Sequence, residues 1–270
     1  MIFCAVLGDP ISHSLSPRMH NLWFQREGID GCMIPVRSSV ESLASNLEAL
    51  QRLGFKGANV TLPLKEKAFQ LSDVRSDASM VCGAANLVCF QNQQITGDNT
   101  DGYGFTWNIR HTVPGWVPRQ AAVIGAGGAA RAILAALIET GAEKILVTNR
   151  TRERISQLPS ALLSSIEIVD WQYRDEMLQD CDVLVNTTSL GMVGNPALPL
   201  RLDALPKSAV VNDIVYKPLE TPLLKAARER GNIVVDGFGM LLHQAVPAFR
   251  AWTGVTPTID ERFREMVLSS

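Results

Sequence analysis

The chain has 270 residues, a formal net charge of −2 and a hydrophobic content of 46%. This length accommodates one large or two modest domains, and a charged content of 19% is typical of a globular protein with a sizeable core. The small net charge gives no reason to expect a nucleic acid or an anionic membrane surface as a partner.

The five cysteines show no C-x-x-C spacing, and the four histidines show no spacing typical of metal ligands. We therefore expect free thiols in a reducing cytoplasm and no metal site. The first residues lack the basic segment of a secretory signal, and no apolar run approaches the length of a membrane span.

The chain begins with an apolar run, residues 2–7, that predicts a buried strand. Ser16 stands before Pro17, which predicts a helix that Ser16 caps and that runs to about Gly28. Ser14 has no such structural task and is a candidate for binding a ligand. A second strand is expected over residues 32–36.

Ser38 and Glu41 have the spacing of a capping box, which predicts that a helix begins there. Residues 57–62 form a short strand, and Lys65 opens the helix that follows it. Asn86 precedes another strand, and Asp101 ends a polar loop before a helix. An isolated surface lysine and a helix-capping aspartate are the structural alternatives to function for Lys65 and Asp101.

These elements predict an α/β unit over residues 1–103. The Pro- and Gly-rich stretch 114–118 is typical of a linker, and a second unit is expected over residues 104–238. The apolar helix that starts near Gly239 is expected to return to the first unit, so that residues 239–270 complete it.

A glycine-rich turn lies between an apolar strand, residues 121–124, and an Ala-rich helix that Gly141 ends. It matches the G-x-G-x-x-G/A pattern that lets a backbone approach a pyrophosphate at a helix N-terminus. A second strand at residues 144–148 supplies the remaining context, and we predict dinucleotide binding. The predicted contacts are Gly125, Ala126, Gly127, Gly128, Ala129 and Ala130.

The residues after that second strand distinguish between two cofactors. An NAD site usually places an acidic residue there, whereas this chain has Asn149, Arg150 and Thr151, with Arg154 one helical turn further on. Guanidinium groups bind a 2′-phosphate bidentately, so these residues favour NADP over NAD.

Three further strands, near residues 181–186, 209–214 and 233–236, extend the second unit. Parallel strands place their ligand-binding loops at one edge, so the glycine turn, Asn149, residues 187–192 and Tyr216 should lie along it. The fold class expected is α/β: an N-terminal α/β unit and a Rossmann-type doubly wound unit, with C-terminal helices that return to the first.

Taken together, these stretches resemble the shikimate dehydrogenase family along nearly the whole chain. The motifs that carry the resemblance are residues 8–11 with 13–17, 59–65, 97–102, 125–130, 149–151, 186–192, 221–224, and 236–241 with Gln244, and Tyr216 is a further matching residue. Eight motifs in the order of the family are far more specific than a glycine turn.

The resemblance implies reversible, NADP-dependent oxidation of shikimate to 3-dehydroshikimate, a step of aromatic amino acid (chorismate) biosynthesis, by a monomer or homodimer in the cytoplasm. It implies that Ser14 and Ser16 bind the substrate carboxylate, with Tyr216 nearby. It places Asn59, Thr61, Asn86, Asp101 and Gln244 on the ring hydroxyls, and Asp77, Thr188, Ile214 and Gly237 on the cofactor. Lys65 and Asp101 would form the catalytic pair.

Oxidation of a secondary alcohol requires a group that accepts the hydroxyl proton. Burial lowers the pKa of a lysine, whereas a neighbouring carboxylate raises it. The residues therefore leave two roles open for Lys65: a base or proton relay, and a cation that stabilises the developing alkoxide.

The chain departs from the family pattern Gly-Ala-Val-Asn-Thr at two positions, Ala85 and Leu87, which bear on substrate choice. Quinate or a related cyclohexene or cyclohexane carboxylic acid is therefore an alternative substrate. A sensor without catalytic activity is a second alternative, which the presence of Lys65 and Asp101 disfavours, because a binding protein needs no proton acceptor.

Overall fold

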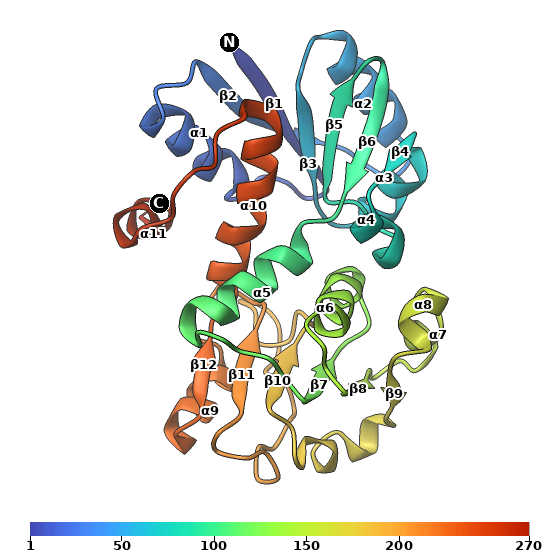
Figure 1. Cartoon of the computed structure of the whole chain (residues 1–270), viewed down its shortest axis with the longest axis vertical. Helices are drawn as coiled ribbons and strands as arrows, with labels where there is room; N and C mark the ends of the chain where they lie inside the picture. The colour runs from blue at the N-terminus through green and yellow to red at the C-terminus, as the bar shows by residue number, and fades with distance from the viewer. Residues whose placement is uncertain (270) are drawn as a thin grey trace. The chain divides into compact units, whose positions relative to one another are not determined.

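The structure of the chain is a computed structural model that describes residues 1–269 (Figure 1). The chain divides into two compact units. Unit 1 comprises Met1–Thr100 and the segment from Leu242 onward, and unit 2 comprises Asp101–Leu241. No helix within residues 1–269 is both long and apolar enough to cross a membrane.

Unit 1 contains a six-stranded mixed sheet with the order β2-β1-β3-β5-β6-β4. Its strands are β1 (Ile2–Gly8), β2 (Gly31–Arg37), β3 (Gly57–Val60), β4 (Val74–Arg75), β5 (Leu87–Gln91) and β6 (Gln94–Asp98). Strands β1, β2 and β3 are parallel, and β5 runs antiparallel to both β3 and β6. The loops after β1 and β3 therefore leave the sheet at the same edge.

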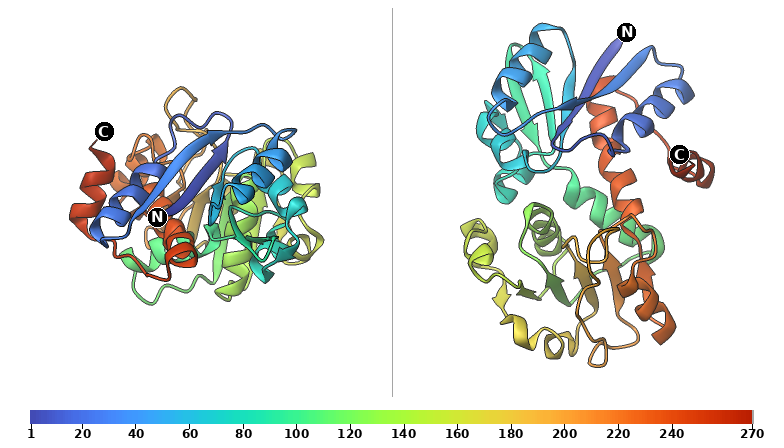
Figure 2. Two further views of the ribbon diagram at one scale, coloured as in Figure 1. Left: turned by 90° about the horizontal axis from the view of Figure 1, so that it is seen from above. Right: turned by 180° about the vertical axis from the view of Figure 1, so that it is seen from behind.

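Helices cover both faces of this sheet, as the views in Figure 2 show. The helices of this unit are α1 (Ser16–Arg26), α2 (Leu43–Arg52), α3 (Lys65–Leu71) and α4 (Asp77–Cys82), with α10 (Gly237–Thr253) and α11 (Glu261–Leu268) near the C-terminus, and α11 packs on α1. Leu47 of α2 and Ala68 of α3 share one apolar core with Ala58 and Val88 of the sheet. Because side chains alternate along a strand, Asn59 lies on the opposite face.

The start of α1 differs from the sequence-based expectation. Leu15 occupies the position before the helix and makes no side-chain capping hydrogen bond, and Ser16 is the first helical residue. The Ser14 Oγ accepts a hydrogen bond of 3.3 Å from the Ser16 amide. The predictions that Ser16 caps the helix and that Ser14 has no structural task were therefore wrong.

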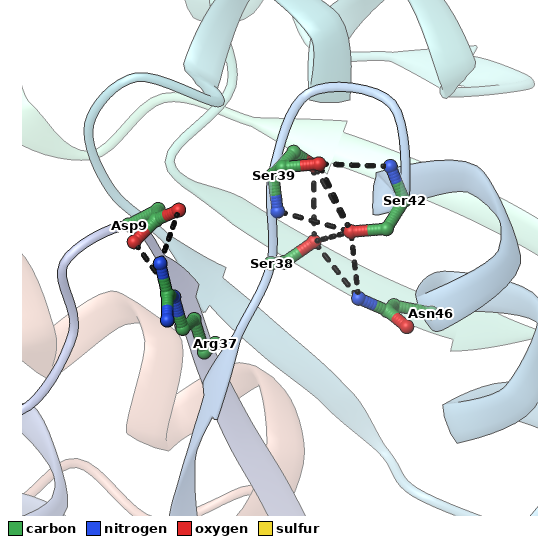
Figure 3. A network of polar contacts seen from close by, with 6 residues as sticks. All are labelled: Asp9, Arg37, Ser38, Ser39, Ser42 and Asn46. Carbon is green, nitrogen blue, oxygen red and sulfur yellow. Dashed lines mark hydrogen bonds and ion pairs between the residues drawn. The ribbon is translucent and has the colours of Figure 1, made fainter.

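The predicted capping box at Ser38 was also wrong, because α2 begins only at Leu43. Ser39 and Ser42 instead bind each other's amides through their hydroxyl groups, and Asn46 donates to the Ser38 Oγ at 2.9 Å (Figure 3). Serine hydroxyls that bind nearby backbone amides compete with a helix, which explains the later start.

Unit 2 contains a six-stranded, entirely parallel sheet with the order β12-β11-β10-β7-β8-β9. Its strands are β7 (Gln120–Ile124), β8 (Lys144–Thr148), β9 (Glu167–Ile168), β10 (Val183–Asn186), β11 (Val210–Asp213) and β12 (Ile233–Val235). The chain order reverses between β7 and β10, which is the switch point of a doubly wound sheet, where ligands bind beyond the carboxyl ends of the strands.

The helices of unit 2 lie on the two faces of this sheet. They are α5 (Asp101–Thr112), α6 (Gly128–Glu139), α7 (Glu153–Ser156), α8 (Ser160–Leu163) and α9 (Pro222–Arg230), with single turns at Trp171–Tyr173 and Glu176–Leu178. Val123 of β7 packs in the core that contains Ile133 of α6, and Ala122 packs in the core that contains Leu224 of α9. The predicted fold class, a Rossmann-type doubly wound unit joined to a second α/β unit, is confirmed.

His20 lies at the centre of an aromatic cluster in unit 1. Its ring is fully buried, and its centroid lies 5.5 Å from that of Trp23, 5.9 Å from that of Phe249 and 5.3 Å from that of Trp252. Burial lowers the pKa of His20 to about 3, from an ordinary value of 6.5, because the charged imidazolium would lose its hydration. The folded state therefore holds His20 neutral.

This burial predicts a loss of stability in acid. Below pH 6.5 the unfolded chain protonates His20 and the folded chain does not, so the stability that depends on neutral His20 is lost as the pH falls toward about 3. Between about pH 7.5 and pH 4.5 this should remove roughly 2–3 kcal/mol from the free energy of unfolding.

Urea titrations of the unmodified chain and of His20→Leu at both pH values measure the effect. The variant should be less stable at both, but its free energy of unfolding should fall by roughly 2–3 kcal/mol less than that of the unmodified chain. Parallel losses in the two proteins would show that His20 does not contribute.

Candidate functional site

The turn between β7 and α6 fits closely between neighbouring strand ends. Gly125 has a φ of +114°, and a Cβ at this position would overlap the Thr187 Oγ1. Its amide donates a hydrogen bond of 2.8 Å to the carbonyl oxygen of Thr148 at the end of β8. Only glycine satisfies both the backbone conformation and the available space at this position.

The next two glycines have a different environment. A Cβ at Gly127 or Gly128 would meet no atom within 4 Å, and Gly127 precedes α6 without a side chain that could cap the helix. The first amides of this 12-residue helix therefore have no side-chain cap, and the helix dipole adds positive potential. Open space in front of uncapped amides fits a diphosphate group.

A pocket of about 430 Å³ lies beyond the end of β8. Its lining consists of Asn149, Arg150, Arg152, Ile155, Val169, Asp170, Trp171 and Gln172. Arg152 forms an ion pair with Asp170, whereas Arg150 is exposed and has no ion pair among residues 1–269. Two arginines and one aspartate leave the pocket with one net positive charge, which suits a phosphate group.

The four residues predicted to select NADP divide into two pairs. Asn149 and Arg150 line the pocket, whereas Thr151 and Arg154 are exposed outside its lining. The side-chain amide (Nδ2) of Asn149 donates a hydrogen bond of 2.7 Å to the carbonyl oxygen of Thr151, which stabilises the turn. Asp170 is a lining residue that sequence reasoning missed, because it follows a strand of only two residues that no pattern indicates.

Three predicted cofactor contacts from distant parts of unit 2 lie at neighbouring strand ends. The Thr188 amide and hydroxyl donate to the Asn186 Oδ1 at 3.0 and 2.8 Å. The Ile214 amide donates to the Asn186 carbonyl oxygen at 3.1 Å, and a Cβ on Gly237 would overlap the Ile214 carbonyl oxygen. The turns after β10, β11 and β12 therefore pack together.

Other predicted residues belong to different units. Tyr216 is half-buried in unit 2, where burial raises the pKa of its phenol. Asp77 is exposed at the start of α4 in unit 1, unlike the other predicted cofactor contacts, which belong to unit 2. Lys65 is the first residue of α3 in unit 1, and Asp101 is the first residue of α5 in unit 2 and is 5% exposed.

The predicted substrate residues near the N-terminus gather at one edge of the sheet in unit 1. A Cβ on Gly8, at the end of β1, would lie 2.5 Å from the Thr61 Cγ2, and the Asp9 amide donates to the Leu62 carbonyl oxygen at 3.2 Å. The loop that leads from β1 to Ser14 therefore packs against the loop that leads from β3 to Thr61.

Buried amides form the second part of this group. The Asn86 Nδ2 donates to the Gln244 Oε1 at 3.2 Å, and the Asn59 Nδ2 lies 3.5 Å from the Asn86 carbonyl oxygen. Thr100, which sequence reasoning missed, donates its amide to the Asn86 Oδ1 at 2.8 Å and its hydroxyl to the Gln244 carbonyl oxygen at 2.8 Å. The Lys65 carbonyl oxygen accepts from the Ala85 amide at 2.9 Å, which links α3 to this group.

The two departures from the family pattern have different surroundings. Ala85 is fully buried and packs in the core beneath α2 and α3. Leu87 is 2% exposed and stands directly opposite Asn59 in the antiparallel pairing of β3 with β5. Directly opposed residues of an antiparallel pair share a face, so Leu87 lies beside the predicted substrate residue Asn59.

The described residues contain no group of three or more His, Cys, Asp and Glu that could hold a metal ion. The side chains brought together are instead amides, hydroxyls and cations, which bind hydroxyl, carboxylate and phosphate groups by hydrogen bonds.

Comparisons with known proteins agree with this arrangement. Residues 6–88 match the family described as shikimate dehydrogenase substrate binding domain, 109–193 match shikimate / quinate 5-dehydrogenase, and 237–261 match shikimate 5'-dehydrogenase C-terminal domain. A relative from Dinoroseobacter shibae named shikimate dehydrogenase (NADP(+)) is 51% identical, over 98% of this chain and 96% of its own.

Two solved structures are similar over nearly the whole chain. Quinate dehydrogenase from Corynebacterium glutamicum in complex with NAD has a TM-score of 0.92 at 32% identity, covering 100% of this chain and 99% of that one. Shikimate 5-dehydrogenase from Thermus thermophilus in complex with NADP(H) and shikimate has a TM-score of 0.87 at 35% identity, covering 99% and 98%. This chain therefore belongs to the shikimate dehydrogenase family.

Proposed function

We propose that this chain is an NADP-dependent dehydrogenase that reversibly oxidises shikimate to 3-dehydroshikimate, in the biosynthesis of aromatic amino acids. The observation that carries the proposal is that one chain of this family contains two kinds of site. One is a group of buried amides and hydroxyls, and the other is a glycine turn beside a pocket of net positive charge. The first suits a polyhydroxylated acid, and the second suits a phosphorylated dinucleotide.

Unit 2 is the proposed cofactor unit. Gly127 and Gly128 leave room for the diphosphate at the start of α6, and Arg150 holds the 2′-phosphate in the pocket beyond β8. Thr188 and Ile214 line the approach of the nicotinamide at the ends of β10 and β11. When bound, NADP supplies the carbon centre that accepts or returns the hydride.

Unit 1 is the proposed substrate unit. Ser14 and Ser16 bind the carboxylate, and Thr61 contributes a hydroxyl for the ring. Asn59, Asn86 and Gln244 present amides to the ring hydroxyls. These residues are only 5%, 3% and 9% exposed, and a site built from buried polar groups discriminates strongly against an acid that lacks a matching hydroxyl.

Lys65 and Asp101 are the proposed catalytic pair. Oxidation of the alcohol releases the one proton of its hydroxyl group, and Lys65 receives or relays that proton, whereas Asp101 accepts a hydrogen bond from another ring hydroxyl. In the reverse direction Lys65 returns the proton to the alkoxide oxygen as the carbonyl is reduced.

Quinate dehydrogenase is the second candidate function, because Leu87 departs from the family pattern next to a predicted substrate residue. Leu87 places an apolar side chain beside Asn59, where the family pattern has a threonine, and the similar structure from Corynebacterium glutamicum is a quinate dehydrogenase. Quinate carries one more hydroxyl than shikimate, at the carbon that bears the carboxylate.

We also propose the cytoplasm as the site of action. All five cysteines are free thiols in the structure, and three of them are buried. Free thiols persist in a reducing compartment, which supports this assignment.

The experiment that tests the function measures absorbance at 340 nm with the full chain, offering shikimate or quinate with NADP+ or NAD+. We expect the highest kcat/KM for shikimate with NADP+. A higher value for quinate would support the second candidate, and binding of shikimate without turnover would support the sensor.

Lys65→Ala tests the proton step. Loss of the group that accepts the proton should lower kcat by about 10²–10⁴-fold and leave NADPH affinity within about twofold. Lys67→Ala, two residues further along the same helix, is the matched control and should retain turnover. Turnover that survives in Lys65→Ala would remove this residue from the mechanism.

Arg150→Ala tests the choice of cofactor. Removal of a guanidinium from the 2′-phosphate site should raise the KM for NADP+ by about tenfold or more and change the KM for NAD+ by less than about twofold. Arg201→Ala controls for the loss of one positive charge, since Arg201 is an exposed arginine of unit 2 paired with Asp203. Equal effects on both cofactors would contradict the phosphate assignment.

Two glycine substitutions should separate folding from cofactor binding. Gly127→Ala adds a methyl group in open space on a backbone that alanine adopts, so the free energy of unfolding should change by less than about 0.5 kcal/mol while NADP+ binds about tenfold more weakly. Gly125→Ala should destabilise the fold by roughly 1–3 kcal/mol, because its φ is positive and its Cβ overlaps Thr187. Calorimetry measures both quantities, and unchanged affinity in Gly127→Ala would contradict a diphosphate at this turn.

A further inference from the structure

A buried carboxylate stands at the end of β11, beside the predicted cofactor contacts. Asp213 is 0% exposed and is the last residue of its strand, directly paired with Asn186, the last residue of β10. A carboxylate without access to water is costly unless donors surround it. Burial raises the pKa of Asp213, and hydrogen bonds from Val215, Thr221 and Asn186 act against this rise.

These three donors come from three different segments of unit 2. The Oδ1 of Asp213 accepts from the Asn186 Nδ2 at 3.0 Å and from the Val215 amide at 3.0 Å. The Oδ2 accepts from the Thr221 hydroxyl at 2.7 Å. The Oδ1 therefore links the end of β10 to the turn after β11, and the Oδ2 links the end of β11 to the start of α9.

The hydrogen bond to Oδ1 determines which way the Asn186 amide faces. Because the Nδ2 must face the carboxylate, the Oδ1 of Asn186 faces the other way, where it accepts from the Thr188 amide and hydroxyl at 3.0 and 2.8 Å. The same Nδ2 also donates to the Leu190 carbonyl oxygen at 3.1 Å. The conformation of residues 188–190 thus depends on Asp213 through one amide.

The hydrogen bond to the Val215 amide bends the chain immediately after β11. Ile214 lies inside this bend, and its amide is held by the Asn186 carbonyl oxygen at 3.1 Å. Gly237 packs closely on this bend, because a Cβ there would overlap the Ile214 carbonyl oxygen. Asp213 and Asn186 therefore hold Thr188 and Ile214 together.

We propose that Asp213 is a positioning residue for the cofactor: through the orientation of Asn186 and the bend at Val215, it places Thr188 and Ile214 against the nicotinamide end of NADP. This proposal rests on the proposed function of unit 2. Asp213 acts by hydrogen-bond geometry and makes no contact with substrate or cofactor itself.

The variants Asp213→Ala and Asp213→Asn distinguish geometry from charge. An asparagine can accept from Asn186 and Val215 through its Oδ1 and donate to the Thr221 hydroxyl, so it retains the geometry without the charge. Calorimetric titration of NADP+ into each full chain should show binding weakened about tenfold or more in Asp213→Ala and within about threefold of the unmodified chain in Asp213→Asn. The KM for shikimate at saturating NADP+ should stay within about threefold in both.

Thr221→Val is the matched control for a structural effect alone. It removes the donor to the Oδ2 and the cap on the Leu224 amide, but it leaves both bonds to the Oδ1. This variant should lower Tm and still bind NADP+ within about threefold of the unmodified chain. Equal weakening in Thr221→Val and Asp213→Ala would overturn the proposal, and so would equal weakening in Asp213→Asn and Asp213→Ala.

Where Asp213→Ala does not fold, Asn186→Ala breaks the same connection at its other end. It should weaken NADP+ binding by about tenfold, and unchanged binding would overturn the proposal. An unmodified chain that neither binds NADP+ nor oxidises shikimate would overturn the proposed function as well. An unmodified chain that does both, with variants that bind NADP+ equally well, would overturn this inference alone.

Discussion

The parallel pairing of β7 with β10 is the constraint on which the arrangement of unit 2 depends. It aligns Ile124 with Asn186, so the glycine turn and the Thr187–Thr188 turn leave the sheet side by side. The Thr187 hydroxyl then donates to the Ile124 carbonyl oxygen at 2.8 Å and occupies the space that a Cβ on Gly125 would need. A shift of one residue in this pairing would separate the glycine turn from the Thr187–Thr188 turn.

The substrate unit is organised by amides rather than by ions. Asn86 uses both ends of its side chain, accepting from the Thr100 amide through the Oδ1 and donating to the Gln244 Oε1 through the Nδ2. Buried amides that satisfy one another have defined orientations, because reversing one would place two donors or two acceptors face to face. Such defined orientations suit the proposed role of these residues in binding ring hydroxyls.

The net charge available to a ligand in the pocket beyond β8 depends on ion pairing as well as on which residues line it. Asp170 would repel a phosphate, but Arg152 pairs with it and leaves Arg150 as the unpaired cation of the pocket among residues 1–269. Arg150 and Arg154 are the arginines predicted from the sequence after β8, but the pocket is lined by Arg150 and Arg152 together with Asp170. Asp170 follows β9, and a strand of only two residues has no pattern that the sequence could reveal.

Several features follow from the sequence alone. Apolar runs next to glycine turns predicted most strands of both sheets, including β8 at its observed bounds, and the order of motifs predicted the family and the fold class. These signals are local, because strand periodicity, turn chemistry and spacing lie within a few residues of one another.

Only the tertiary structure decided which polar groups satisfy one another. No local pattern indicated the partners of Asp213 or of Thr100, although Thr100 lies in the motif 97–102, since an aspartate that ends a strand and a threonine that precedes a helix are common in any turn. Their roles come from partners elsewhere in the chain: Asn186 and Thr221 for Asp213, and Asn86 and Gln244 for Thr100. Sequence patterns predict where a strand ends, but burial and strand order determine which groups meet there, and these depend on contacts between distant segments.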